Sequence, residues 1–71
     1  MIKFNLKSIL EEKEISIYWL AQNTDLTYTT LHRIVNNKTE GIQFHTLKEI
    51  MLALEINDFN KVFKLIEEEN Q

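Results

Sequence analysis

The feature that most constrains the fold is a short polar break between two helical patterns in the middle of the chain. Two sets of apolar residues follow helical spacing: Ile17, Leu20 and Ala21, then Leu31, Ile34 and Val35. Only a few non-helical residues, beginning with Asn23-Thr24-Asp25, separate the two sets. The two helices must therefore cross steeply instead of lying antiparallel, which is the helix-turn-helix arrangement.

Size and composition indicate one small helical domain. A chain of 71 residues can bury a single core, and its 44% apolar content, lack of proline and single glycine, Gly41, suit helices joined by short turns. Cysteine is absent, so disulfides and thiolate metal sites are excluded. No apolar run approaches the roughly 18 residues of a membrane span, and no secretory leader pattern opens the chain.

The sequence predicts an all-α fold, a compact bundle of five short helices in one domain over residues 1–71. The predicted helices begin after caps at Asn5, Ser16 and Thr27, at about Phe44, and after a cap at Asp58. The first ends near Glu14 and the fourth near Leu54, and Asn37 is a plausible left-handed helix stop. The helix-turn-helix covers about residues 16–36 and the C-terminal helix about 58–68. No alternation is long enough for a sheet.

The outer face of the third helix is the candidate functional surface. Helical steps of three, four and seven residues bring together five side chains: Tyr28, Thr29, His32, Arg33 and Asn36. The face carries no acid, which suits the major groove because phosphates flank the base edges. Arg33 can pair with guanine, Thr29 can contact thymine or an acceptor, and Asn36 can bind a base or a phosphate. An ordinary solvated helix face would give the same pattern, and the net charge of −3 argues mildly against DNA.

From Asn5 to Phe59 the sequence resembles the Cro and phage-repressor (Xre-type) helix-turn-helix family. The matching pieces are Ser16, Leu20-Ala21, the bend at Asp25, Leu26-Thr27, Leu31, Ile34, Asn36-Asn37-Lys38-Thr39, Thr46-Leu47-Lys48-Glu49-Ile50 and Ala53-Leu54. The resemblance implies a lambda-repressor-like fold and a transcriptional regulator that binds palindromic operator DNA, usually as a dimer. It also implies a cytoplasmic protein in a bacterial or phage-infected cell.

The resemblance assigns roles to particular residues. Base readout falls to Tyr28, Thr29 and Arg33, with His32 on the same face. Contacts to the DNA backbone fall to Ser16, Thr27, Asn36, Asn37 and Lys38. Asp25 stands where the family usually has a glycine, in a bend that favours left-handed backbone.

The predicted fifth helix carries more apolar residues than one core needs. Phe59, Phe63 and Ile66 are therefore candidates for a dimer contact, and simple closure of the core is the alternative. On the second helix, we expect Tyr18 or Trp19 to pack into the core, although either could instead contact DNA or a partner.

A second interpretation keeps the fold without DNA binding. The domain would then be a protein-interaction module, an antirepressor or a partner of another regulator, as the acidic balance and apolar C-terminal segment suggest. An enzyme is not expected, because Thr27, Thr29 and Thr30 with His32 lack a strained elbow or an oxyanion site. His32 and His45 lie on different helices without cysteines, so neither a metal site nor a cofactor is predicted.

Overall fold

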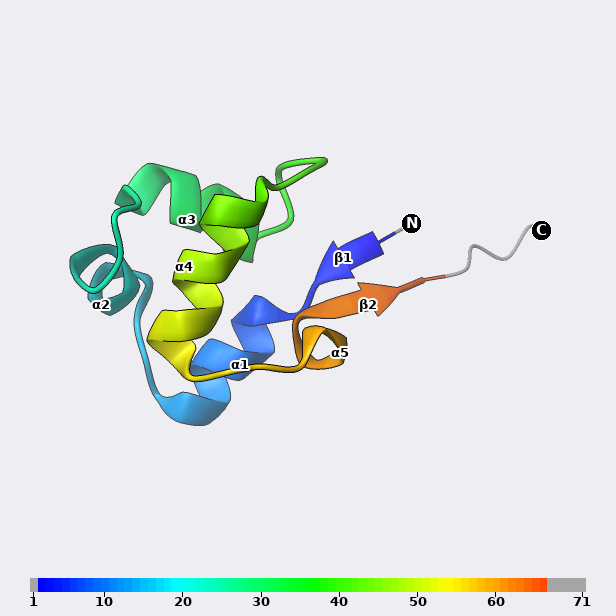
Figure 1. The fold of residues 1–71 in the computed structure, drawn as a ribbon, viewed down its shortest axis with the longest axis horizontal. Coiled ribbons are helices and arrows are strands. Elements are labelled where there is room, and N and C mark those ends of the chain that lie inside the picture. The colour runs from blue at the N-terminus through cyan, green and yellow to red at the C-terminus, as the bar shows by residue number, and fades with distance from the viewer. Residues whose placement is uncertain (1, 67–71) are drawn as a thin grey trace.

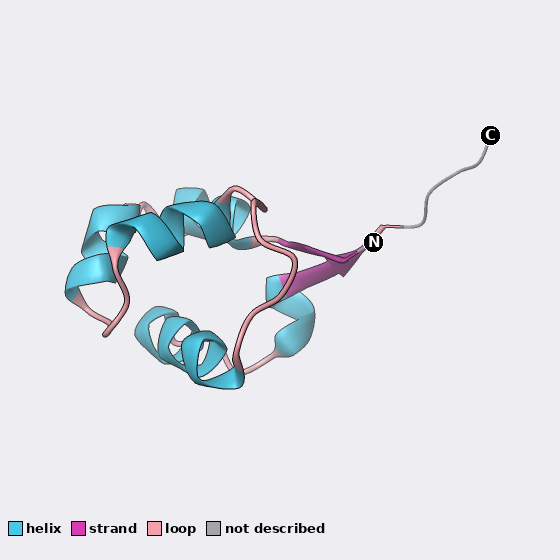
Figure 2. Cartoon of the chain, turned by 90° about the horizontal axis from the view of Figure 1, so that it is seen from above, coloured by secondary structure: helices cyan, strands magenta, loops and turns pink. Residues whose placement is uncertain are grey.

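Residues 2–66 of the computed structural model are described, and they form five helices and a two-stranded sheet (Figure 1). The elements in chain order are β1 (Ile2–Phe4), α1 (Leu6–Lys13), α2 (Ile17–Gln22), α3 (Tyr28–Val35), α4 (Phe44–Leu54), α5 (Phe59–Val62) and β2 (Phe63–Leu65). The helices make the body of the domain, and the sheet projects from one end (Figure 2). No helix within these residues is long and apolar enough to cross a membrane.

One apolar core joins the five helices. It consists of Leu6, Ile9, Leu10, Leu20, Leu31, Ile34, Val35, Leu47, Ile50, Met51, Leu54 and Val62, all buried. The inward-facing stripe predicted for α3, Leu31, Ile34 and Val35, is therefore confirmed, and α1 and α4 each bury a similar stripe. On α2 only Leu20 is fully buried, while Ile17 and Ala21 pack half-buried against the core. No polar or charged residue between 2 and 66 is buried.

The predicted helix starts are confirmed, and three of them are capped by the expected side chains. The Ser16 hydroxyl accepts a hydrogen bond from the Trp19 N–H at 3.0 Å, and the Thr27 hydroxyl accepts one from the Thr30 N–H at 3.2 Å. The Asp58 carboxylate accepts from the Asn60 N–H at 2.9 Å. These bonds satisfy amides that have no partner inside a helix. Asn5 precedes α1 as predicted, but its side chain makes no cap hydrogen bond.

The prediction of left-handed backbone is right for Asn37 and wrong for Asp25. Among the described residues, positive φ occurs at Glu14 (59°), Asn37 (57°) and Glu55 (59°). At the corner between α2 and α3, the Thr24 hydroxyl donates to the Leu20 carbonyl at 2.7 Å and accepts from the Leu26 N–H at 3.3 Å. This side chain bridges the corner, and Asp25 is not among the residues with positive φ.

Two glutamates hold the left-handed positions that end α1 and α4, where glycine is usual. Glu14→Gly and Glu55→Gly are each expected to raise the free energy of unfolding by about 0.5–1 kcal/mol, because glycine removes the Cβ clash of left-handed backbone. Urea denaturation measures the change. Glu11→Gly, inside α1, is the matched control and should destabilise by a similar amount. A loss at both Glu14 and Glu55 would contradict the left-handed assignments.

The C-terminal helix predicted over 58–68 is wrong beyond its first turn, and the fold is not purely all-α. Phe63–Leu65 leaves the helix and pairs antiparallel with β1, in the register Ile2–Leu65, Lys3–Lys64 and Phe4–Phe63. The Phe4 and Phe63 rings pack with centroids 5.3 Å apart, next to the buried core. The last two residues of the predicted helix lie outside the described part of the chain.

The expectation that Tyr18 or Trp19 would enter the core is also wrong. Both side chains are exposed, Tyr18 to 63% and Trp19 to 39%. The Tyr18 hydroxyl accepts a hydrogen bond from the Gln22 side-chain amide at 3.0 Å, one helical turn later. Leu20 supplies the buried contact of α2, so neither aromatic ring is needed there.

Candidate nucleic-acid interface

The structure brings the predicted reading residues together on the outer face of α3, defined by Tyr28, Thr29, His32 and Arg33. All four are exposed, while Leu31, Ile34 and Val35 are buried behind them. Asn36 follows α3 directly and is half-buried, and its amide donates to the His32 carbonyl at 2.9 Å. Asn36 therefore helps to close the helix as well as lying beside its outer face.

One flank of this face is aromatic and lies next to α1. The Tyr28 and His32 rings stack with centroids 5.9 Å apart and an interplanar angle of 25°. Both rings line a hollow that also includes Glu11 and Glu14 of the first helical segment. The face is acid-free on α3 itself, but α1 places two carboxylates at its border. Sequence patterns within one helix could not reveal these neighbours.

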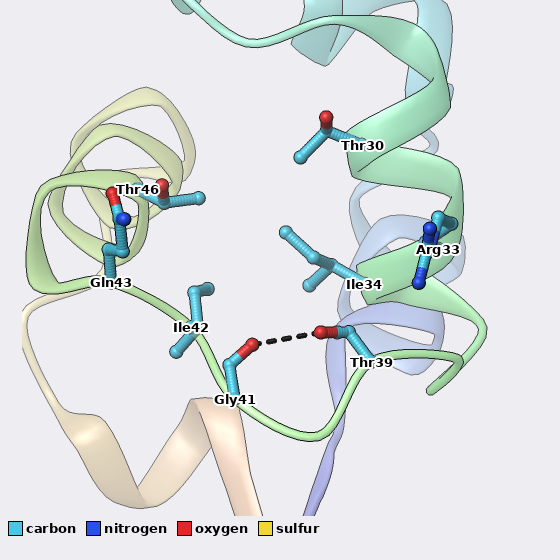
Figure 3. Close-up of a pocket in the computed structure, with 8 residues that line it drawn as sticks. All are labelled: Thr30, Arg33, Ile34, Thr39, Gly41, Ile42, Gln43 and Thr46. Carbon is cyan, nitrogen blue, oxygen red and sulfur yellow. Dashed lines mark hydrogen bonds between the residues drawn. The ribbon is translucent and has the colours of Figure 1, made fainter.

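The other flank faces the start of α4 across the α3–α4 loop, residues 36–43. Thr30 and Ile34 extend toward Gln43 and Thr46, and Arg33 lines the same hollow from the α3 side (Figure 3). Within residues 2–66 the Arg33 guanidinium has no ion pair or hydrogen bond. Its positive charge is exposed to solvent.

The start of α4 adds a candidate contact that is not among the predicted site residues. Gln43 is exposed, occupies the N-cap position of α4 and makes no cap hydrogen bond with its side chain. It lines the same hollow as Arg33. The loop before it is braced by the Thr39 hydroxyl, which donates to the Gly41 carbonyl at 3.0 Å. A polar residue at the predicted start of the fourth helix was the signal available in the sequence.

The residues predicted to contact the DNA backbone differ in whether their side chains already form hydrogen bonds within the protein. Ser16 and Thr27 cap α2 and α3, so their hydroxyls already accept backbone hydrogen bonds. Lys38 is exposed in the α3–α4 loop, and its N–H donates to the Arg33 carbonyl at 2.7 Å. Only Lys38 among these three brings a charged group that the described protein leaves unpaired.

Asn37 is occupied inside the protein. Its side-chain oxygen accepts from the Phe4 N–H at 2.7 Å, and its side-chain nitrogen donates to the Phe4 carbonyl at 3.2 Å. The amide thus pairs with the outer edge of β1 as a neighbouring strand would. Asn37 ties the sheet to the C-terminal end of α3, and this is the role that the hydrogen bonds support.

The three predicted dimer residues do not share one helix face. Phe59 lies on α5 and is 61% exposed, Phe63 lies on β2 half-buried against Phe4, and Ile66 is half-buried after β2. Phe59 instead borders a hollow with Phe44, which is 88% exposed. Helical periodicity does not indicate this pairing of the α4 start with α5. No three metal-binding side chains gather anywhere in the described range 2–66.

A capped helix that follows a tight corner, with a cation and hydrogen-bonding groups on its outer face, is the arrangement found in helix-turn-helix DNA-binding domains. The sequence profile of the Cro/C1-type HTH DNA-binding domain matches residues 5–66, which is most of the chain. The chain belongs to this family.

A solved structure has the same fold. A crystal structure from Bacteroides fragilis, provisionally described as a DNA-binding protein, aligns with a TM-score of 0.76 and 23% sequence identity. The alignment covers 90% of this chain and 100% of that chain. At this identity the likeness concerns the fold. A comparison with curated proteins gave no match.

Proposed function

We propose that the chain is a sequence-specific transcriptional regulator of the phage or prophage repressor type, which binds operator DNA through α3. The observation that carries the proposal is the unpaired Arg33 on an outer face whose own helix carries no acid. A regulator of this kind acts on DNA in the cytoplasm of a bacterial or phage-infected cell. It needs neither enzymatic activity nor a cofactor.

In this mechanism α3 enters the major groove. At about 100° per residue, Thr29 and Arg33 point furthest from the core, and Tyr28 and His32 lie at the side. Arg33 is placed to pair with guanine, and Thr29 to contact a neighbouring base edge. Ser16 and Thr27 position the helix ends, while Lys38 and Gln43 contact phosphates and carry no sequence information themselves. Regulation then follows from occlusion or recruitment at a promoter.

The operator in this proposal is palindromic and is bound by a homodimer. Two copies related by a two-fold axis place their α3 helices in half-sites about 34 Å apart. Phe59, with its exposed neighbour Phe44, is the best-supported part of the predicted dimer contact, because both rings face solvent in one chain. Phe63 and Ile66 contribute less, since each is half-buried.

A protein-interaction module is the second candidate. The exposed Phe44 and Phe59 and the net charge of −3 favour it, because apolar surface of this kind commonly marks contacts with other proteins. The unpaired cations at Arg33 and Lys38 favour DNA instead.

Selection of random duplex DNA on the purified protein tests the proposal. We expect an enriched two-fold motif, and we expect Arg33→Ala to weaken binding to it by roughly 5–150-fold and to relax the preference at one base pair in each half-site, which corresponds to about 1–3 kcal/mol. Lys61→Ala, which removes one positive charge from α5, is the matched control. No enriched motif and no binding at low salt would reject the regulator and favour the protein-interaction module.

A further inference from the structure

The small sheet has one apolar face and one basic face. Side chains alternate along a strand, so Ile2, Phe4, Phe63 and Leu65 share one face, and Lys3 and Lys64 share the other. The register places these two lysines directly opposite each other. Both are exposed, and within residues 2–66 neither has an ion pair. Like charges in directly opposed positions destabilise a sheet, so the protein alone gains nothing from this arrangement.

The apolar face is covered in part by the protein itself. The Phe4 and Phe63 rings pack against each other beside the core, and Ile2, Phe63 and Leu65 line a hollow with Asn60 of α5. Figure 2 shows the two strands close to edge-on, with the short helix α5 on one side of them. The lysines therefore project from the side of the sheet that α5 does not cover.

The sheet is fixed next to the proposed DNA-binding surface. The two hydrogen bonds between Asn37 and Phe4 hold β1 at the C-terminal end of α3. Lys3 lines a hollow with Asn37, Thr39 and Glu40 of the α3–α4 loop. Lys38 belongs to the same loop and Lys64 lies opposite Lys3 in the sheet, so three lysines lie in this region, together with the acid Glu40.

We propose that Lys3 and Lys64 form a second contact to the phosphate backbone of duplex DNA, next to the half-site that α3 reads and continuous with Lys38. A phosphate bound between the two ammonium groups replaces their repulsion by attraction and releases counterions from the DNA. Duplex DNA is the ligand that the geometry favours over an acidic protein, because the lysines continue a surface that already carries Arg33 and Lys38. The inference rests on the proposed function.

The test compares Lys3→Gln/Lys64→Gln with the wild-type protein on selected operator DNA and on unrelated duplex DNA over a range of salt concentrations. The slope of log Kobs against log salt concentration should fall by about 1–2, since each phosphate contact contributes about 0.9. The operator and unrelated DNA should lose affinity by the same factor, because phosphate contacts do not read sequence. Lys13→Gln, at the exposed end of α1, is the matched control and should leave the slope unchanged.

A stability measurement excludes unfolding as the cause. Removing two facing charges should leave the melting temperature of the double variant equal to or above that of the wild type. A second variant, Lys64→Glu, creates an opposite-charge pair with Lys3, and it should melt higher while its salt slope falls at least as far. Weaker DNA binding in a more stable protein is not explained by damage to the fold.

Two results would overturn the inference without affecting the proposed function. In one, the double variant has the same salt slope as the wild type and still binds the Arg33-dependent motif. The other is an equal fall of the salt slope in the Lys13→Gln control, because the change would then come from net charge and not from the position of the lysines. Failure of the wild-type protein to bind any duplex DNA would overturn the proposed function together with this contact.

Discussion

Asn37→Ala is expected to lower the free energy of unfolding by about 2–5 kcal/mol. Alanine in left-handed backbone costs about 1–2 kcal/mol, and two lost hydrogen bonds cost about 0.5–1.5 kcal/mol each. Asn37 makes both contributions, since its φ is 57° and its amide bonds to the N–H and carbonyl of Phe4. Urea denaturation followed by circular dichroism measures the loss, which is large for a small domain stable by about 4–10 kcal/mol.

Asn37→Gly separates the two contributions. Glycine accepts the left-handed backbone without strain, so this variant should lose only the bonds to β1 and fall between the wild type and the alanine variant. Amide exchange at Phe4 should accelerate in both variants. If both variants kept full stability and lost only DNA affinity, Asn37 would be a DNA contact, and the tie between α3 and β1 would be refuted.

Leu31→Ala is expected to destabilise the domain by about 2–5 kcal/mol, the usual cost of a fully buried leucine. Leu31 is 0% exposed and lies on the inner face of α3, in the same core as Leu20 and Ile50. The cavity would lie directly behind the outer face of α3, so DNA binding should be lost with the fold. Thermal and urea unfolding measure the change.

Leu52→Ala is the control for this substitution, because it removes the same atoms from a side chain that is 67% exposed on α4. Its effect should stay within about 0.5 kcal/mol. An equal loss at the two positions would contradict the single-chain core. It would mean that another chain covers Leu52 in solution.

The parts of the fold that local sequence determines were predicted correctly. Ser16 and Thr27 signal helix starts through bonds that reach only three residues along the chain, and the spacing of Leu31, Ile34 and Val35 defines the buried side of one helix. The family resemblance extended this local information to the whole domain. Local patterns and the family resemblance were sufficient to predict four of the five helices, including the bounds of α4.

The errors involve contacts between residues that are far apart in the sequence. Each strand of the sheet is only three residues long and is defined by its partner, and the pairing Ile2–Leu65 joins opposite ends of the described chain. Phe63 continues an apolar helical pattern, but its ring packs against the ring of Phe4 and the residue lies in a strand. Likewise, nothing near Asn37 in the sequence indicates Phe4 as its partner, and nothing near His32 indicates Glu11 and Glu14.

The candidate site was predicted as a set of residues but not as a surface. Tyr28, Thr29, His32 and Arg33 share a helix, so periodicity was sufficient to group them. Gln43 and Lys3 join this region only through the path of the α3–α4 loop and the sheet. Their positions depend on tertiary packing, which periodicity does not describe.

The sheet also has a consequence for the order in which we expect the domain to assemble. The helix pair that carries the outer face of α3 is made from neighbouring segments, so it can form early, whereas β1 and β2 must close nearly the whole chain into a loop. We therefore expect strand pairing to be the last step of folding and the first to be lost. In native-state hydrogen exchange, the Lys3 and Asn5 amides should open at lower free energy than those of Leu31 and Ile50, so the sheet can detach while α3 keeps its place.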